Sequence, residues 1–168
     1  MQITTTLADI AAKAEAKDAE NQAFRTFLQS QESDSIDELV QELDALITPQ
    51  IDCTTCGNCC RSLMINVTAD EINVLAAHLG RTEADVKKEY VETGSHGGIM
   101  IMNTIPCHFL KNDCCTIYEQ RFAECREFPG LHNPQFTKRL FATLAHYGRC
   151  PIIYNVIEEM KVRLRFNS

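Results

Sequence analysis

The sequence feature that most constrains this chain is the clustering of its cysteines. All 9 cysteines of the 168-residue chain lie between Cys53 and Cys150. Four of them fall in one short run, Cys53-Thr-Thr-Cys56-Gly-Asn-Cys59-Cys60. Cysteines that serve only as small hydrophobic side chains would be scattered along the chain. The clustering therefore predicts a shared chemical role for these thiols.

The compartment decides which role the thiols can have. Residues 1–6 show no basic region followed by an apolar stretch, so we expect no secretory signal and a cytoplasmic protein. We also expect no membrane span, because no run of ~18 apolar residues occurs. Stable disulfides are rare in a reducing cytosol, which makes disulfides a less favoured alternative. A thioredoxin-type pair, which needs a βαβ frame, and inert buried thiols are also less favoured than metal binding.

The spacing of the first four cysteines is typical of a metal-binding loop. A gap of two residues lets a tight turn bring two sulfur atoms to one metal ion. Gly57 gives the backbone room to wrap around the bound atom. We expect the neighbouring side chains of Cys59 and Cys60 to point apart, toward different metal atoms or different sides of one cluster. Because one loop cannot enclose a metal centre, more distant cysteines must supply the other ligands.

Composition and length predict a single globular domain over residues 1–168. Hydrophobic residues make up 45% of the chain and charged residues 23%, which is ordinary for a folded protein. Within the domain we expect an N-terminal helical segment over 1–49 and a Cys-rich metal-binding core over 53–150. The expected fold class is mainly α, a small α+β fold. Short helices and a minor β-hairpin would surround a Cys-ligated metal centre.

Hydrophobic spacing and capping signals predict the helices. Residues 1–30 are expected to form one amphipathic helix, either continuous or interrupted. A capping box from Ser35 to Glu38 would open a second helix that Pro49 ends. The later helices are expected over 68–79, from 82 onward, and over 116–125, 137–147 and 152–164.

The first of these later helices should begin with a capping box of Thr68 and Glu71, and Gly80 should close it. Together with the helix that Thr82 and Asp85 open, it predicts an αα-hairpin packed on the core rather than a DNA-binding pair. A strand is expected over 99–102 as one arm of a hairpin that runs to Cys107, after a flexible turn over 94–98.

The charge and the missing motifs exclude several function classes. A formal net charge of −7 argues against nucleic acid as a partner, because binding phosphates needs a positive surface. The sequence holds no Gly-rich dinucleotide fingerprint and no HExxH metalloprotease motif. Among the histidines, His108 is the best candidate for an acid or base, since it adjoins Cys107.

The cysteine-bearing motifs resemble the YkgJ-type cysteine-cluster family of zinc- or iron-chelating domains. The family's CxxCxxCC motif matches residues 53–60. Its C-x-F-L and C-x-I-Y blocks match Cys107-His-Phe-Leu and Cys115-Thr-Ile-Tyr. Its R-P-x-x-C-R-x-F-P block matches 121–129, with Phe122 in place of the usual proline. The resemblance covers at least residues 35–162.

The resemblance implies a set of eight metal ligands. They are Cys53, Cys56, Cys59, Cys60, Cys107, Cys115, Cys125 and Cys150. Cys114 has no counterpart in the family and is left out of the set. A helix expected to begin at Thr116 would direct its amides toward the sulfur of Cys115. Four arginines near ligand cysteines could balance thiolate charge or form ordinary surface pairs: Arg61, Arg121, Arg126 and Arg149.

An all-thiolate ligand set limits the metal to a few kinds. Eight thiolates suit up to two zinc sites of four cysteines each, or one [4Fe–4S] cluster with a second centre. The spacing of Cys53, Cys56 and Cys59 repeats the CxxCxxC part of bacterial ferredoxin loops, which gives the iron–sulfur cluster a slight preference. Calcium and magnesium are excluded, because both metals prefer oxygen ligands.

The sequence therefore predicts a metal-binding protein of unassigned biological role, with metal ions as its only assigned partners. The centre could be structural, or the protein could handle or sense metal. The alternative is a cluster-dependent enzyme. It would carry out electron transfer or a methyl transfer like that of flagellin lysine methylases, whose cysteine block is similar. A non-catalytic centre is favoured over an enzyme without excluding one, since the sequence shows no dinucleotide fingerprint and no metalloprotease motif, and the catalytic residues of such an enzyme are unknown.

Overall fold

The chain divides into two compact units in the computed structural model, which describes residues 2–94 and 98–167. The helical unit comprises Met1–Asp52 and Pro129–Ser168, and the cysteine unit comprises Cys53–Phe128. The cysteine unit contains every cysteine except Cys150, whereas the expected Cys-rich core reached that residue. The expectation of a single domain stays a prediction.

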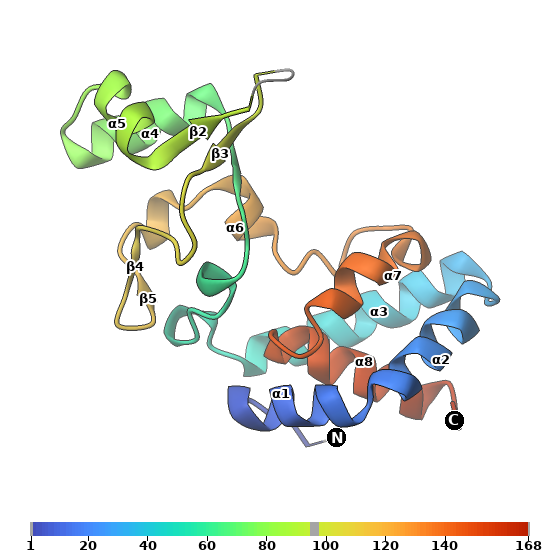
Figure 1. The fold of residues 1–168 in the computed structure, drawn as a ribbon. Helices are drawn as coiled ribbons and strands as arrows, with labels where there is room; N and C mark the ends of the chain where they lie inside the picture. Colours follow the sequence, from blue (N-terminus) through green and yellow to red (C-terminus); the bar gives the residue numbers. More distant parts are fainter. Residues whose placement is uncertain (1, 95–97, 168) are drawn as a thin grey trace. The chain divides into compact units, whose positions relative to one another are not determined.

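Helices make up the helical unit, and helices with short strands make up the cysteine unit, which confirms the mainly α, small α+β class (Figure 1). The helical unit contains α1 (Leu7–Ala16), α2 (Asp18–Gln29), α3 (Ser33–Ile47), η1 (Thr48–Gln50), α7 (Phe136–Ala145) and α8 (Pro151–Arg163). Helix α3 packs against α7 and α8, α2 packs against α7, and α1 packs against α2 and α8. Among the residues that the structure describes, no helix has the length and apolar character needed to cross a bilayer.

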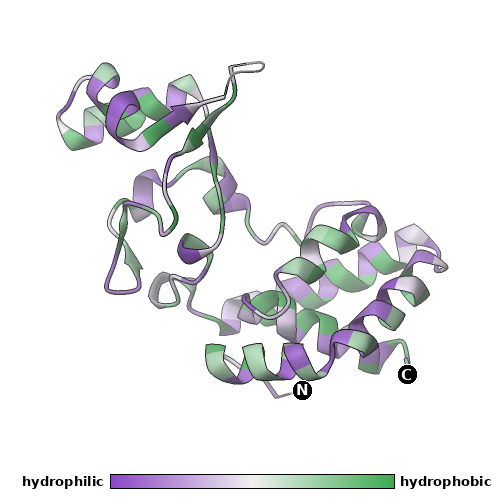
Figure 2. Cartoon of the chain, viewed as in Figure 1, coloured by the Kyte–Doolittle hydropathy of each residue, from purple (hydrophilic) through white to green (hydrophobic). Residues whose placement is uncertain are grey.

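The N-terminal helices follow the predicted amphipathic pattern. The expected helix over 1–30 is interrupted at Lys17, which ends α1. Figure 2 shows hydrophilic and hydrophobic residues side by side along α1, α2 and α3. The apolar residues supply a core that includes Phe24, Leu28 and Leu43, all with no exposed surface. Burial of this side of each helix supplies most of the stability that short helices lack on their own.

The predicted capping box at Ser35 is wrong. Helix α3 begins at Ser33, three residues before the start that a Ser35 cap would give, and its N-cap is Glu32, whose carboxylate accepts hydrogen bonds from the amides of Asp34 and Ser35. The free amides of a first turn can be satisfied by an oxygen-bearing side chain such as Ser35 or Glu32, and here Glu32 does so. The helix ends at Ile47 as expected, before the short turn η1 that contains Pro49.

A buried ionic network lies between the helices of the helical unit. Nζ of Lys161, whose side chain is 7% exposed, lies 2.7 Å from Oε1 of Glu20 and 2.8 Å from Oε1 of Glu158. It also donates to Oδ1 of Asn21, and Lys17 pairs with Glu158. The hydroxyl of Tyr147 donates to Oε1 of Glu158 at 2.9 Å. These contacts join α1, α2 and α8, and their loss would leave buried charge without a partner.

The cysteine unit is built from short elements. In chain order they are η2 (Cys53–Thr55), η3 (Cys59–Arg61), β1 (Asn66–Val67), α4 (Ala69–Leu79), α5 (Glu83–Tyr90), β2 (Val91–Thr93), β3 (Met100–Met102), β4 (Leu110–Lys111), β5 (Cys114–Cys115), η4 (Tyr118–Gln120) and α6 (Ala123–Glu127). Strands β1, β3 and β2 form one antiparallel sheet, and β4 pairs with β5 in a second.

The capping signals of α4 and α5 are confirmed. The hydroxyl of Thr68 accepts from the amide of Glu71, and the carboxylate of Glu71 accepts from the amide of Thr68. Gly80 closes α4 with a φ of 63°, in the left-handed region that favours glycine. Thr82 caps α5 through the amide of Asp85.

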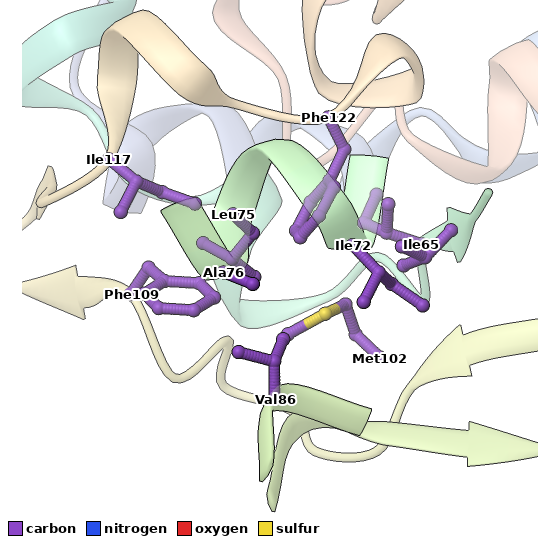
Figure 3. Close-up of a cluster of buried hydrophobic side chains, with 10 residues drawn as sticks. Ile65, Ile72, Leu75, Ala76, Val86, Met102, Phe109, Ile117 and Phe122 are labelled. Carbon is purple, nitrogen blue, oxygen red and sulfur yellow. The ribbon is translucent and has the colours of Figure 1, made fainter. Parts of the chain in front are cut away.

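One apolar core underlies the cysteine unit. Figure 3 shows residues of α4 lying among side chains from β3, the β4–β5 region and the segment before α6. The core residues are Ile65, Val67, Ile72, Leu75, Ala76, Val86, Met102, Phe109, Ile117 and Phe122. The side chains of Cys107, Cys115 and Cys125 pack against this core. The apolar core thus holds three of the predicted ligands in place.

Two of the expected elements differ from the structure. The strand expected over 99–102 is present as β3, but it pairs with β1 and β2 rather than with a strand that runs to Cys107. The helix expected over 116–125 is divided into η4 and α6, because Arg121 and Phe122 adopt extended ψ angles of 148° and 155°. Residues 95–97, in the expected flexible turn, lie outside the described residues.

Candidate metal centre

The CxxCxxCC loop folds as two short 3₁₀ turns, η2 and η3, joined at Gly57. This glycine has a φ of +58°. A Cβ atom there would lie 2.6 Å from the carbonyl oxygen of Asp113 and 2.9 Å from Cδ1 of Leu110. Only glycine combines the left-handed backbone with so close an approach. The loop therefore lies directly against the turn between β4 and β5.

Polar contacts also join the loop to the hairpin region. The amide of Cys107 donates a hydrogen bond of 2.8 Å to the carbonyl oxygen of Cys60. Arg61, just after the last cysteine of the loop, forms an ion pair with Asp113 in the hairpin turn. The ion pair is exposed and is expected to contribute little stability by itself. Together with the Gly57 contact, these bonds bring the first four cysteines close to Cys107 and Cys115.

The thiols of Cys59 and Cys60 interact through a hydrogen bond that shifts the pKa of both. That they serve different metal atoms or different sides of one cluster stays a prediction. The hydrogen bond lowers the pKa of Cys59 to about 6, against burial, because the thiol of Cys60 stabilises a neighbouring thiolate. The same bond raises the pKa of Cys60, with further contributions from burial and from the charges of Cys59, Cys107 and Cys115. The two neighbouring thiols therefore differ in how easily each loses its proton.

The half-buried cysteines of the later segments are neighbours of this pair. Burial raises the pKa of the Cys107 thiol, and the charges of Cys115 and Cys59 add to the effect. Burial raises the pKa of Cys125 to about 12, with contributions from Cys107, Cys59 and Cys115. Mutual electrostatic effects of this kind require the thiols to lie near one another. We name this set of Cys59, Cys60, Cys107, Cys115 and Cys125 the five-thiol cluster.

The other predicted ligands stand outside the cluster. Cys53 is exposed and Cys56 is half-buried, and the turn η2 that holds Cys53 packs against β5. Cys150 is buried in the helical unit, where it is the N-cap of α8. Cys114 is exposed on β5 beside the half-buried Cys115, as alternation along a strand requires.

The cluster is not a ready-made coordination sphere. Among the residues that the structure describes, no three Cys, His, Asp or Glu side chains lie in a geometry that could hold a metal ion. No disulfide joins any of the nine cysteines, all of which belong to the described residues. The donor set nevertheless suits a soft metal in kind, since all of its members are thiols. Binding a metal would release their protons and draw the sulfur atoms together.

Several neighbours that the sequence suggested have other partners in the structure. Thr116 does not begin a helix; its amide and its hydroxyl both donate to the carbonyl oxygen of Phe109. Arg121 lies over the ring of Tyr118, with its guanidinium carbon 3.9 Å from the ring centroid. Nε2 of His108 lies 2.7 Å from Oδ1 of Asn103, and its ring packs edge-on against Tyr90. These side chains have structural partners of their own.

Two carboxylates hold the segment around Cys125 through long-range hydrogen bonds. Glu71 accepts a hydrogen bond of 2.6 Å from the amide of Ala123, in addition to its capping role. Glu124 accepts from the amide and from Nδ2 of Asn66, at 2.8 and 2.7 Å. The capping pattern identified Glu71, but no local pattern could show its second, long-range bond.

Comparison with known protein families gives a match. A family model named CxxCxxCC, described as "Putative zinc- or iron-chelating domain", matches residues 52–147. The chain belongs to the CxxCxxCC family. The match is shorter than the expected resemblance over 35–162, and it ends before Cys150. No curated protein and no solved structure matches the chain. Membership of the CxxCxxCC family identifies the chain as a zinc- or iron-binding protein.

Proposed function

We propose that the protein holds its metal centre through eight cysteine thiolates. The proposed ligands are Cys53, Cys56, Cys59, Cys60, Cys107, Cys115, Cys125 and Cys150. The preferred centre is a [4Fe–4S] cluster, and the alternative is zinc in up to two sites of four thiolates each. The reducing compartment expected from the sequence would keep the thiols available for the metal.

The five-thiol cluster carries this proposal. Its cysteines come from the loop, the segment before β4, strand β5 and helix α6, which are far apart in the sequence. The pKa of Cys60 is raised first by its hydrogen bond with Cys59, and the pKa values of Cys107 and Cys125 are raised first by burial. In all three, the charges of neighbouring thiolates raise the pKa further. A bound cation would reverse this effect, because it stabilises all of the thiolates at once.

The proposed role of the centre is to hold the cysteine unit together, or to bind metal for storage or sensing, without catalysis. The unit has one small apolar core and short strands of two or three residues. Such small elements are marginally stable without further support. Metal affinity would then appear as folding free energy, as in other small Cys-rich domains.

The test is elemental analysis and visible spectroscopy of the full chain purified without oxygen. A [4Fe–4S] cluster predicts a brown protein with about four iron and four sulfide per cluster. A zinc protein is colourless, with one or two zinc ions per chain and no sulfide. Removal of the metal by a chelator should lower the thermal stability. A chain that contains neither metal, even after reconstitution under reducing conditions, contradicts the proposal.

A further inference from the structure

Helix α6 carries Cys125 but has little means of holding its own position. It is five residues long, from Ala123 to Glu127. Its N-cap, Phe122, makes no side-chain capping hydrogen bond. A helix this short is not stable by itself. The position of Cys125 must therefore come from contacts with other elements.

Two carboxylates supply these contacts through the two residues just before the cysteine. Glu71, on α4, accepts the amide of Ala123 through Oε1, while its Oε2 accepts the amide and hydroxyl of Thr68. Glu124, next to Cys125, accepts the amide and side chain of Asn66 on β1. Carboxylate acceptors form hydrogen bonds about twice as strong as neutral ones.

The charge on Glu71 suits this position. Burial opposes ionisation, but hydrogen bonds from Ala123 and Thr68 and the charge of Arg126 lower the pKa of the carboxyl below its usual value. Glu71 is therefore ionised at neutral pH and binds two backbone segments at once, the start of α4 and the start of α6. The side chain of Phe122, 3% exposed, packs into the core just before the same helix. This packing leaves α6 little freedom to turn.

We infer that Glu71 is a positioning residue for metal binding: through the amide of Ala123 it orients α6 so that the sulfur of Cys125 faces Cys59, Cys107 and Cys115. The inference rests on the proposed function, since it assigns Cys125 a metal to bind. Residues that orient a ligand in this way usually change metal affinity by about 10–100-fold when they are removed.

The experiment is an anaerobic titration of the metal-free full chain with Co²⁺, whose thiolate charge-transfer absorption reports the number of sulfur ligands. The variant E71A should bind Co²⁺ about 10–100-fold more weakly than wild type. Its thiolate charge-transfer absorption should equal that of C125S, because both variants lack a correctly placed Cys125 sulfur. The conservative variant E71Q keeps one oxygen for the amide of Ala123 and should lie closer to wild type. E71Q also tests the positioning role of Glu71 if E71A does not fold.

The matched control is T68A. It removes the hydroxyl that caps α4 but leaves Oε1 of Glu71 on the amide of Ala123. T68A should keep the wild-type Co²⁺ spectrum, although it weakens the same helix. The double variant E71A/C125S should bind no more weakly than C125S, because the effect of Glu71 passes through Cys125.

The outcomes separate the inference from the proposed function. If E71A and E71Q bind Co²⁺ like wild type, the positioning role of Glu71 is wrong. The role is also wrong if E71A weakens Co²⁺ binding in the C125S background as much as in wild type. Neither result contradicts the metal centre itself. An equal loss of thiolate absorption in T68A would show a general effect of the α4 cap and would also overturn the role. If the wild-type chain gives no thiolate–Co²⁺ absorption, the proposed function itself fails.

Discussion

The amide of Cys107 donates a 2.8 Å hydrogen bond to the carbonyl oxygen of Cys60. This bond joins the last cysteine of the CxxCxxCC loop to the first cysteine of the second half of the ligand set. Because it is a backbone bond, it fixes the two segments relative to each other whatever the state of the thiols. Changes that separate the two segments should therefore reduce metal binding as well as stability.

Replacing Gly57 by alanine should separate them. The new Cβ atom would lie 2.6 Å from the carbonyl oxygen of Asp113, at a φ of +58°. We expect a loss of about 1–2 kcal/mol from the left-handed backbone and about 1–3 kcal/mol more from the overpacked contact. Denaturant unfolding gives the stability, and elemental analysis gives the metal content, which should also fall.

Gly80 provides the control for this prediction. Its φ is +63°, but a Cβ atom there would meet no atom within 4 Å. The variant G80A should lose only the backbone contribution and keep its metal. Equal losses of stability and metal in the two variants would show that the loop does not need the close approach at Gly57.

Single cysteine-to-serine variants should divide the cysteines into ligands and non-ligands. C107S and C125S should weaken metal binding by more than about tenfold, since even residues behind the ligands usually matter that much. C114S should bind like wild type, because Cys114 is exposed on the strand that holds Cys115. Competition with a chromophoric chelator measures these affinities.

C150S tests the ligand that lies outside the family match and outside the cysteine unit. The eight-thiolate proposal expects C150S to lose metal, as C107S does. Wild-type metal content in C150S would limit the centre to the cysteines of residues 53–128.

The stability of the helical unit should depend on acid pH through Glu158. Burial opposes its ionisation, but hydrogen bonds from Lys161 and Lys17 lower its pKa below the usual value of about 4.3. Its contribution is therefore complete above that value and is lost as the pH falls through the lower pKa of the folded state. E158Q should cost about 1–3 kcal/mol at pH 7, and the difference from wild type should shrink in strong acid.

Urea unfolding at several pH values measures this difference. E159Q is the control, because Glu159 pairs with the exposed Arg163, and such pairs contribute about 0–1 kcal/mol. A gap between wild type and E158Q that stays constant from neutral pH to pH 3 would assign the effect to packing rather than to charge.

The length of the chain predicts one cooperative domain, and substitutions in the two units can test this. Leu43 in the helical unit and Ile72 in the cysteine unit are both fully buried. L43A and I72A should each cost about 2–5 kcal/mol. If the chain is one domain, each variant should lower a single unfolding transition. Two calorimetric transitions, each lowered by only one of the variants, would show two independent domains.

The elements that the sequence predicted well are those set by local chemistry. The capping box of Thr68 and Glu71 and the left-handed Gly80 are confirmed, because the residues that form each cap are adjacent in the chain. The pairing of β3 with β1 and β2 was missed. Strands of two or three residues leave too short a pattern to show their partners.

The site shows the same division between local and long-range information. Motif spacing indicated which cysteines belong together, and five of the eight are electrostatic neighbours in the cysteine unit. The hydrogen bond between the thiols of Cys59 and Cys60 was not predicted, because it depends on the backbone geometry of the loop. The bond from Ala123 to Glu71 was also missed, since it joins residues that only the tertiary fold brings together.

The most direct test of the central claim is X-ray absorption spectroscopy of the anaerobically purified chain at the edge of its bound metal. The proposal predicts a first shell made of sulfur only, at ~2.3 Å for zinc, with an additional iron–iron contribution if the centre is an iron–sulfur cluster. A first shell of oxygen or nitrogen atoms would contradict a centre held by cysteine thiolates.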